Sequence, residues 1–154
     1  MVKQLVYLWL VPITALVIVD EWLKAVGLQR LPSEGSLVDP GIISFAIHKN
    51  WGVAFDIPFK LELVIFFSFI IGAVLANTAW RNLKTKPFVA FASIVILLGA
   101  AGNLFDRIHY GFTVDYIILF GRSAINLSDL VIISGVVMLL MTTSRRKRKH
   151  NHPH

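Results

Sequence analysis

Four long apolar segments alternate with polar stretches along the chain. Their bounds are Leu5–Lys24, Leu63–Trp80, Phe88–Phe105 and Ile125–Thr143. Each approaches the length of about 20 residues that an α-helix needs to cross a hydrocarbon layer of about 30 Å. The pattern therefore predicts an all-α membrane protein with four transmembrane helices.

Two longer polar stretches separate these segments. In the first, residues 25–60, the β-prone run Ile42–Ile47 stands between turn signals at Asp39-Pro40-Gly41 and Asn50-Trp51-Gly52. We therefore expect a small β-containing loop region between the first and second helices. The second stretch, residues 106–124, is expected to be a loop that brings the chain back to the same side of the membrane.

The composition favours the same class of protein. Hydrophobic residues make up 56% of the 154 residues and charged residues only 16%, with a mean hydropathy of +0.70. Soluble domains carry about 25% charged residues, so this balance is typical of a membrane protein. We expect one integral-membrane domain over residues 1–144, followed by a basic tail over residues 145–154.

The first apolar segment is expected to stay in the protein as a helix. Its apolar run ends in Asp20, Glu21 and Lys24 and not in the small residues of a signal-peptide cleavage site. Pro12 lies within it, and transmembrane helices tolerate proline where neighbouring groups satisfy the freed carbonyl. We expect a kink at most.

The charged residues indicate an orientation. Nine of the 15 basic residues fall at places that share one side of a four-helix topology: Lys3, Arg81, Lys84, Lys86 and the run from Arg145 to Lys149. All nine acidic residues lie elsewhere. By the positive-inside rule the basic side is cytoplasmic, with both termini there. The net charge of +6 thus reflects topology, and we expect no nucleic-acid partner.

The basic tail is expected to rest on anionic lipid headgroups. Its three histidines, at positions 150, 152 and 154, could also bind a metal adventitiously. The chain has no cysteine, which excludes disulfides, thiolate metal sites and a cysteine nucleophile. Any chemistry here uses oxygen and nitrogen groups.

Two aspartates are the strongest candidates for chemistry. Asp129 stands about one turn inside the fourth predicted helix, where an unpaired carboxylate is costly, although the helix dipole could also favour it there. Asp115 lies on the preceding loop, and a solvated loop carboxylate is its ordinary interpretation. Two carboxylates brought together can share a proton, so that one acts as a base and the other as an acid.

Other polar residues gather at the same outer level, and each allows a structural interpretation. Asp106 and Arg107 could form an ion pair or a carbonyl cap at a helix end, and Asp20 and Lys24 have the i, i+4 spacing of local helix support. Asn103 and Asn126 could join helices or hold the aspartates in place. His48 and His109 are expected at the surface, and neither has metal-ligand spacing. The small-residue run from Gly99 to Gly102 suits close helix packing.

Five motifs, in order, resemble the successive signatures of bacterial lipoprotein signal peptidase, also called signal peptidase II. They are DEWLK at Asp20 to Lys24, NWGVAF at Asn50 to Phe55, GNLFDR at Gly102 to Arg107, VDYI at Val114 to Ile117, and INLSD at Ile125 to Asp129. The resemblance extends from about residue 5 to residue 143, over all four predicted helices.

This resemblance implies an intramembrane aspartic endopeptidase that cleaves diacylglyceryl-modified prolipoproteins just before the lipidated cysteine. By motif, the catalytic aspartates would be Asp115 and Asp129. The residues that shape the site or position the substrate would be Asp20, Lys24, Asn50, Gly52, Asn103, Asp106, Arg107 and Asn126. We expect no cofactor and no metal, a monomer among membrane lipids of the bacterial cytoplasmic membrane, and an active site on the extracytoplasmic face.

The chain departs from the family pattern at four positions. Ile125 and Ser128 replace the usual aromatic residue and alanine of the last motif, Glu21 stands where glutamine is common, and Val53 where alanine is common. Because both aspartates are present, these changes bear on pocket shape and substrate preference more than on activity.

Two other functions fit part of the sequence. Intramembrane carboxylates also mark ion paths, as in a small ion- or proton-coupled carrier. Such a carrier needs acidic residues through the membrane depth, whereas the central spans of the second and third predicted helices have none. The chain could also be an inactive homologue that binds lipoproteins, and a cleavage assay distinguishes that alternative.

Overall fold

The computed structural model describes residues 2–37, 41–52 and 59–150, and within them the side chains of residues 5–37, 41–52 and 59–142. The expected turn residues Asp39 and Pro40 and the motif residue Val53 lie outside these ranges. The elements, in chain order, are η1 (Val2–Trp9), α1 (Leu10–Arg30), η2 (Glu34–Ser36), β1 (Ile43–Asn50), α2 (Leu61–Asn82), α3 (Pro87–Tyr110), β2 (Thr113–Leu119), β3 (Ser123–Ile125) and α4 (Leu127–His150).

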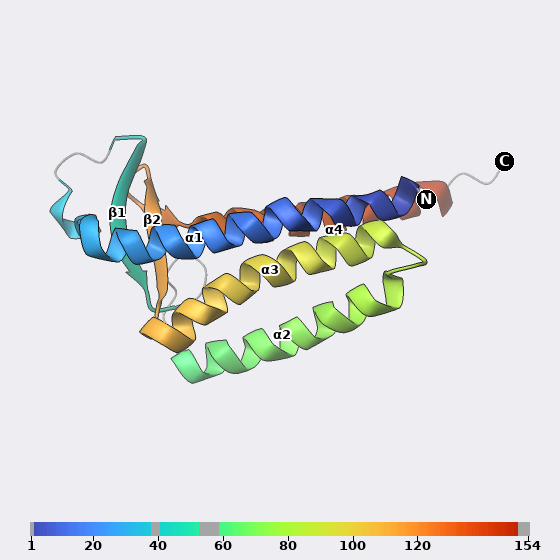
Figure 1. Cartoon of the computed structure of the whole chain (residues 1–154), viewed down its shortest axis with the longest axis horizontal. Helices are drawn as coiled ribbons and strands as arrows, with labels where there is room; N and C mark the ends of the chain where they lie inside the picture. Colours follow the sequence, from blue (N-terminus) through green and yellow to red (C-terminus); the bar gives the residue numbers. More distant parts are fainter. Residues whose placement is uncertain (1, 38–40, 53–58, 151–154) are drawn as a thin grey trace.

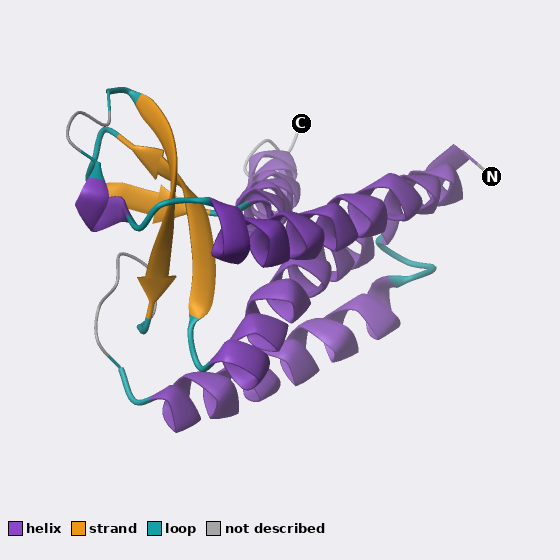
Figure 2. Cartoon of the chain, turned by 60° about the vertical axis from the view of Figure 1, so that its left-hand side comes forward, coloured by secondary structure: helices purple, strands orange, loops and turns teal. Residues whose placement is uncertain are grey.

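The four α-helices lie side by side, and a small sheet lies across one end of them (Figure 1). Helix α3 packs against each of the other three α-helices. The strands run across the helix ends and not alongside the helices, as Figure 2 shows. The 3-10 helix η1 and the α2–α3 turn lie at the opposite end.

The outer helix surfaces are apolar, as a bilayer requires. Helix α2 has 11% of its apolar stretch buried in the protein, and Phe69 and Val74 are among its exposed large side chains. By length and composition, three described helices can cross a membrane: Leu5–Arg30, Leu61–Asn82 and Pro87–Tyr110. The apolar part of α4, Leu127–Thr142, is shorter. The membrane-type helical fold is therefore confirmed, whereas four crossings stay a prediction.

The sheet has the strand order β1-β2-β3, with both pairs antiparallel. Among the described residues, β1 comes from the stretch between α1 and α2, and β2 and β3 come from the stretch between α3 and α4. Its core consists of Ile47, Phe112, Val114 and Tyr116, packed against apolar residues of α1 that include Leu23 and Leu28. The sheet thus closes one end of the helix bundle.

Two predicted boundaries at the sheet end were wrong. Helix α1 continues from Lys24 to Arg30, because its last turns bury apolar residues against the sheet. Helix α3 continues from Phe105 to Tyr110 and ends at Gly111, whose φ of 84° is the left-handed conformation typical of a helix C-terminus. The expected loop at 106–124 is therefore one helical turn and two strands.

The small-residue run on α3 allows α4 to approach closely. A Cβ atom added at Gly99 would lie 2.6 Å from the carbonyl oxygen of Ser128 and 2.9 Å from Cγ1 of Ile132. Glycine at this position therefore sets the separation of the two helices. Because α4 begins at Leu127, that separation also positions its first turn.

Gly99→Ala should lower the free energy of unfolding by about 1–3 kcal/mol, because the added methyl group forces the start of α4 away from α3. Thermal unfolding in detergent micelles measures the change. Gly72→Ala is the matched control, since a Cβ there would meet the nearest atom, of Leu97, at 3.9 Å. Equal unfolding temperatures for the two variants would contradict this account of the packing.

Candidate active site

Helix α4 begins with a capping box formed by Asn126 and Asp129. The Asn126 side-chain Oδ1 accepts a hydrogen bond from the backbone N–H of Asp129 at 2.9 Å. In return, Asp129 Oδ2 accepts one from the backbone N–H of Asn126 at 3.2 Å. This reciprocal pair satisfies two N–H groups that a helix start leaves without partners. It fixes the Asp129 carboxylate at the first turn.

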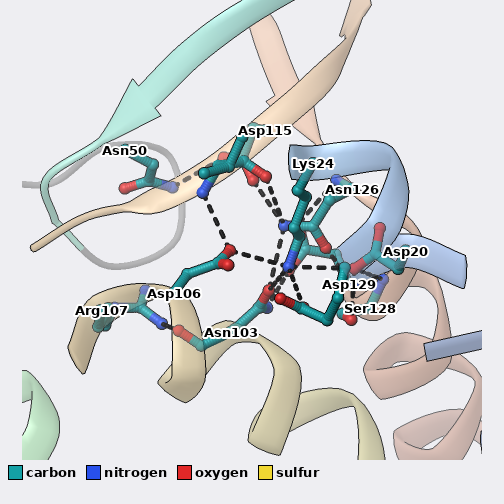
Figure 3. A network of polar contacts seen from close by, with 12 residues as sticks. Asp20, Lys24, Asn50, Asn103, Asp106, Arg107, Asp115, Asn126, Ser128 and Asp129 are labelled. Carbon is teal, nitrogen blue, oxygen red and sulfur yellow. Dashed lines mark hydrogen bonds and ion pairs between the residues drawn. The ribbon is translucent and has the colours of Figure 1, made fainter. Parts of the chain in front are cut away.

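The same asparagine connects Asp129 to Asp115. Because a backbone N–H can only donate, Asn126 must turn Oδ1 toward Asp129, and its Nδ2 then points toward β2. That Nδ2 donates to Asp115 Oδ1 at 2.7 Å (Figure 3). Asn126 is fully buried. One amide group therefore holds both predicted catalytic aspartates.

Asn103 of α3 supports Asp129 in a similar way. Lys24 Nζ, which can only donate, approaches Asn103 Oδ1 at 3.3 Å. The Nδ2 group of Asn103 is left to donate to Asp129 Oδ1 at 2.7 Å. Asn126 Nδ2 also approaches Asn103 Oδ1, at 3.1 Å, so the two amides contact each other. Both structural interpretations of these asparagines apply, because their side chains join helices and also hydrogen-bond the aspartates.

Asp115 lies on β2 and is 1% exposed. Its second oxygen, Oδ2, accepts a hydrogen bond from Asn50 Nδ2 of β1 at 3.1 Å. The Asn50 Oδ1 atom accepts one from the backbone N–H of Gly52 at 3.1 Å, which fixes the amide. Asp115 is thus held from β1 and from α4 at once.

Burial raises the pKa of Asp115 to about 7, and the negative charge of Asp129 adds to that rise. Hydrogen bonds from Asn50 and Asn126 and a positive charge on His48 act in the opposite direction but are weaker. The Asp115 carboxyl group therefore exchanges its proton near neutral pH.

Lys24 lies at the centre of a cluster of three acidic residues, two of which are buried. Its Nζ atom is 3.1 Å from Asp20 Oδ2, 2.9 Å from Glu21 Oε1 and 2.8 Å from Asp106 Oδ2. The side chains of Lys24, Asp20 and Asp106 are fully buried. The local pair between Asp20 and Lys24 exists, yet the cluster also joins α1 to α3. Removing one member of a buried pair typically costs about 3–5 kcal/mol, because the other charge is left unpaired.

Asp20 also reaches across to the start of α4. Its carboxylate accepts hydrogen bonds from the backbone N–H groups of Leu127 and Ser128, at 3.0 and 3.2 Å. The Ser128 hydroxyl donates to it at 2.6 Å and the Tyr116 hydroxyl at 2.8 Å. A carboxylate of α1 therefore caps α4, where the helix dipole favours negative charge.

Asp106 and Arg107 do not pair with each other among the ion pairs of the described residues. Asp106 contacts Lys24 and accepts a hydrogen bond from the backbone N–H of Val114 at 3.1 Å, which fixes the start of β2. Arg107 donates to the carbonyl oxygens of Asn103 and Gly52, each at 3.2 Å. The carbonyl-cap alternative thus applies to Arg107.

A cavity of about 690 Å³ opens beside the two aspartates. Asp115, Asp129, Asn50, Asn103 and Arg107 give one part of it polar walls, and another part is apolar: Ile118, Ile125, Ile132 and Ile133. Its volume is in the range of sites that bind small molecules or peptide segments. Another cavity, of about 560 Å³, lies around Pro87 and Met141 near η1 and has no acidic residue in its lining.

Three contributors were not predicted from the sequence. Glu21 is an acceptor for Lys24, and Tyr116 and Ser128 are donors to Asp20. The spacing of Asn126 and Asp129 is the Asn-x-x-acid signal of a capping box, which could have shown how the two residues meet. The site geometry brings every sequence-predicted site residue into one connected set around the start of α4.

This fold and site define a class of protein: a helical membrane protein with a network of buried acidic and amide side chains at one end. The family model described as signal peptidase (SPase) II matches residues 12–145. The lipoprotein signal peptidase of Syntrophomonas wolfei is 35% identical over 127 residues, which cover 81% of this chain and 85% of the relative. That of Pseudomonas aeruginosa is 30% identical, over 98% of this chain and 95% of the relative.

Two solved structures described as bacterial membrane enzymes share the fold. One has a TM-score of 0.80 at 22% identity, and covers 94% of this chain and 92% of the other. The second has a TM-score of 0.66 at 24% identity, with coverages of 86% and 90%. The chain belongs to the signal peptidase II family, which is a family of membrane peptidases. The resemblance seen in its motifs is confirmed.

Replacing Asn126 should separate its two roles. Asn126→Ala removes the cap and the link to Asp115, and should lower the free energy of unfolding by about 0.5–2 kcal/mol. Asn126→Ser keeps a capping oxygen but has no N–H group for Asp115, so only the part of the stability that comes from the cap should return. Peptidase activity should fall by about tenfold or more in both variants, since each loses a hydrogen bond to a buried carboxyl group.

Thermal unfolding and a cleavage assay on the same preparations measure the two effects. A serine variant with full activity would show that the link from Asn126 to Asp115 is dispensable.

Proposed function

We propose that this protein is an aspartic endopeptidase that removes signal peptides from diacylglyceryl-modified prolipoproteins by cleaving just before the lipidated cysteine. Membership of the signal peptidase II family supports the substrate class. The observation that supports the proposed chemistry is the position of Asn126, whose side chain joins Asp115 to Asp129 beside a cavity. Neither metal nor cofactor takes part in the reaction that we propose.

In the proposed reaction the two aspartates have different tasks. Asp115 holds the shared proton at neutral pH, since burial raises its pKa to about 7. Asp129 takes a proton from water, whose oxygen attacks the scissile carbonyl carbon, while Asp115 gives its proton to the carbonyl oxygen. As the C–N bond breaks, the proton on Asp129 passes to the leaving nitrogen, and the carbonyl re-forms and returns the other proton to Asp115. Both carboxyl groups then regain their initial states.

The other site residues support this pair by holding the elements that carry it. Lys24, Asp20 and Asp106 tie α1 to α3 and to the start of α4, while Asn103 and Asn126 orient the carboxyl groups. The substrate's signal helix would lie along the apolar part of the cavity, which includes Ile132 and Ile133. Its diacylglyceryl group would remain in the outer leaflet.

The topology that we propose has four crossings and both termini in the cytoplasm of a bacterial cell. Helix α4 continues beyond its apolar part to His150, which gives it enough length to cross a bilayer. The basic α2–α3 turn lies at the end opposite the sheet, as the positive-inside rule requires for an extracytoplasmic site. Residues 1–144 would form one monomeric domain in the cytoplasmic membrane, and residues 145–154 a lipid-bound tail.

Asp115→Asn and Asp129→Asn should each remove prolipoprotein cleavage while the protein still inserts into membranes. Asparagine has nearly the same shape, but it can neither accept the proton from water nor supply one at neutral pH. A gel-shift assay with purified enzyme and a diacylated prolipoprotein measures the loss. Full cleavage by either variant would contradict the two-aspartate mechanism, and absence of cleavage by the unchanged protein would favour the inactive homologue.

The cleavage rate should fall as the pH rises above about 7, because Asp115 then loses the proton that it gives to the substrate. The sign follows from the raised pKa: the carboxyl group is protonated below that pH and ionised above it. Rates at saturating substrate from about pH 5 to 9 test this, with thermal unfolding at each pH as the control. A rate that rises steadily to pH 9 would contradict the assignment of Asp115 as the acid.

A further inference from the structure

His48 lies directly across from Asp115 in the sheet. The two residues are paired in the antiparallel register of β1 and β2, in which paired Cα atoms are about 4.5–5.5 Å apart. Asn50, two residues along β1, shares the face of His48 and donates to Asp115. Both His48 and Asp115 line the 690 Å³ cavity. Strand β1 thus presents two polar side chains to one carboxyl group.

Glu34 orients the imidazole ring of His48. The distance from His48 Nδ1 to Glu34 Oε1 is 2.7 Å, so Nδ1 carries a hydrogen that points to the carboxylate. The backbone holds Glu34 near β1, because Ile47 N–H donates to the carbonyl oxygen of Pro32 at 2.8 Å and Ser33 forms a parallel bridge with Ile47. The His48 side chain is only 17% exposed, so most of it is enclosed in the wall of the cavity.

Each element packed near His48 carries charged residues. Glu34 belongs to η2, Asp115 to β2, Arg107 to α3 and Asp129 to α4, and Arg122 stands before β3; all five line the cavity. On α1, Lys24 and its acidic neighbours face one another and Asp106, and Arg30 is exposed. Lys49 points to the other face of β1, where its Nζ is 5.2 Å from the ring centroid of Phe112.

We propose that His48, oriented by Glu34, is a positioning residue of the peptidase: its ring, when protonated, places a positive charge opposite Asp115 and thereby sets the upper pH limit of cleavage. This inference rests on the proposed function, in which Asp115 is the acid. A positive charge opposite Asp115 favours the ionised carboxylate, so it limits how far burial and Asp129 can raise the pKa. In this role His48 passes no proton to the substrate.

The charge on His48 can be removed or made permanent. His48→Gln should move the pH at which the cleavage rate falls upward by about one unit, as expected for one charge a few ångströms from a buried carboxyl group. His48→Lys should leave that pH where it is or move it downward. The Glu34→Gln background should reduce the effect of His48→Gln, because the ring then loses its orientation.

Lys49→Gln is the matched control. It removes one positive charge from the neighbouring position of β1, on the opposite face, and should leave the pH profile unchanged. Equal profiles for His48→Gln and Lys49→Gln would overturn the inference, as would the same shift in His48→Gln and His48→Lys. Asp115→Asn in the same assay distinguishes a failure of the proposed function from a failure of this inference. Cleavage by Asp115→Asn would contradict the proposed function. If Asp115→Asn is inactive and the His48→Gln profile is unshifted, only the role of His48 is contradicted.

Discussion

The amide group of Asn126 keeps two carboxyl groups at one end of a membrane protein within reach of each other. Two carboxylates at such a site repel, and each loses the hydration that it would have in water. Asn126 counters both effects, since its Oδ1 caps the helix that carries Asp129 and its Nδ2 donates to Asp115. The orientation of the amide is fixed by the backbone N–H of Asp129. Helix capping and the proposed chemistry therefore depend on the same side chain.

The rest of the bundle keeps the first turn of α4 in place. Gly99 lets α4 approach α3, and Asp20 caps α4 from α1. Lys24 stabilises Asp20 and, through Asn103, orients the second amide that contacts Asp129. A buried lysine with three acidic neighbours is expensive to desolvate, and replacing such clusters with apolar residues often stabilises a protein. Its benefit here is geometric, because it joins three helices at one point.

The sequence was informative where one pattern decides one structure. Apolar segments of membrane length predicted the helices, and the concentration of Asp20, Asn103, Asp115 and Asp129 near one level predicted where they would gather. The motif resemblance supplied the family, which the comparisons confirm. The residue roles implied by the resemblance stay proposals, tested by the variants described above.

Other features depend on contacts between distant segments, which periodicity does not encode. Strands β2 and β3 looked like a loop because β3 has only three residues and β2 pairs with a strand about 70 residues earlier in the chain. Asp106 and Arg107 are adjacent and of opposite charge, yet each bonds to a different element. Ser128 departs from the usual alanine of the family motif, and its hydroxyl donates to Asp20, which only the arrangement of α1 against α4 reveals.

The proposed chemistry depends on the electrostatic interaction between the two aspartates. Carbon-13 NMR of labelled aspartate carboxyl groups, titrated in micelles, reports the pKa of Asp115 in the unchanged protein and in the Asp129→Asn variant. We expect a pKa near 7 in the unchanged protein and a clearly lower pKa in the variant, because the negative charge of Asp129 is then absent. The same value in both proteins would show that the two carboxyl groups act independently, and would contradict a shared proton.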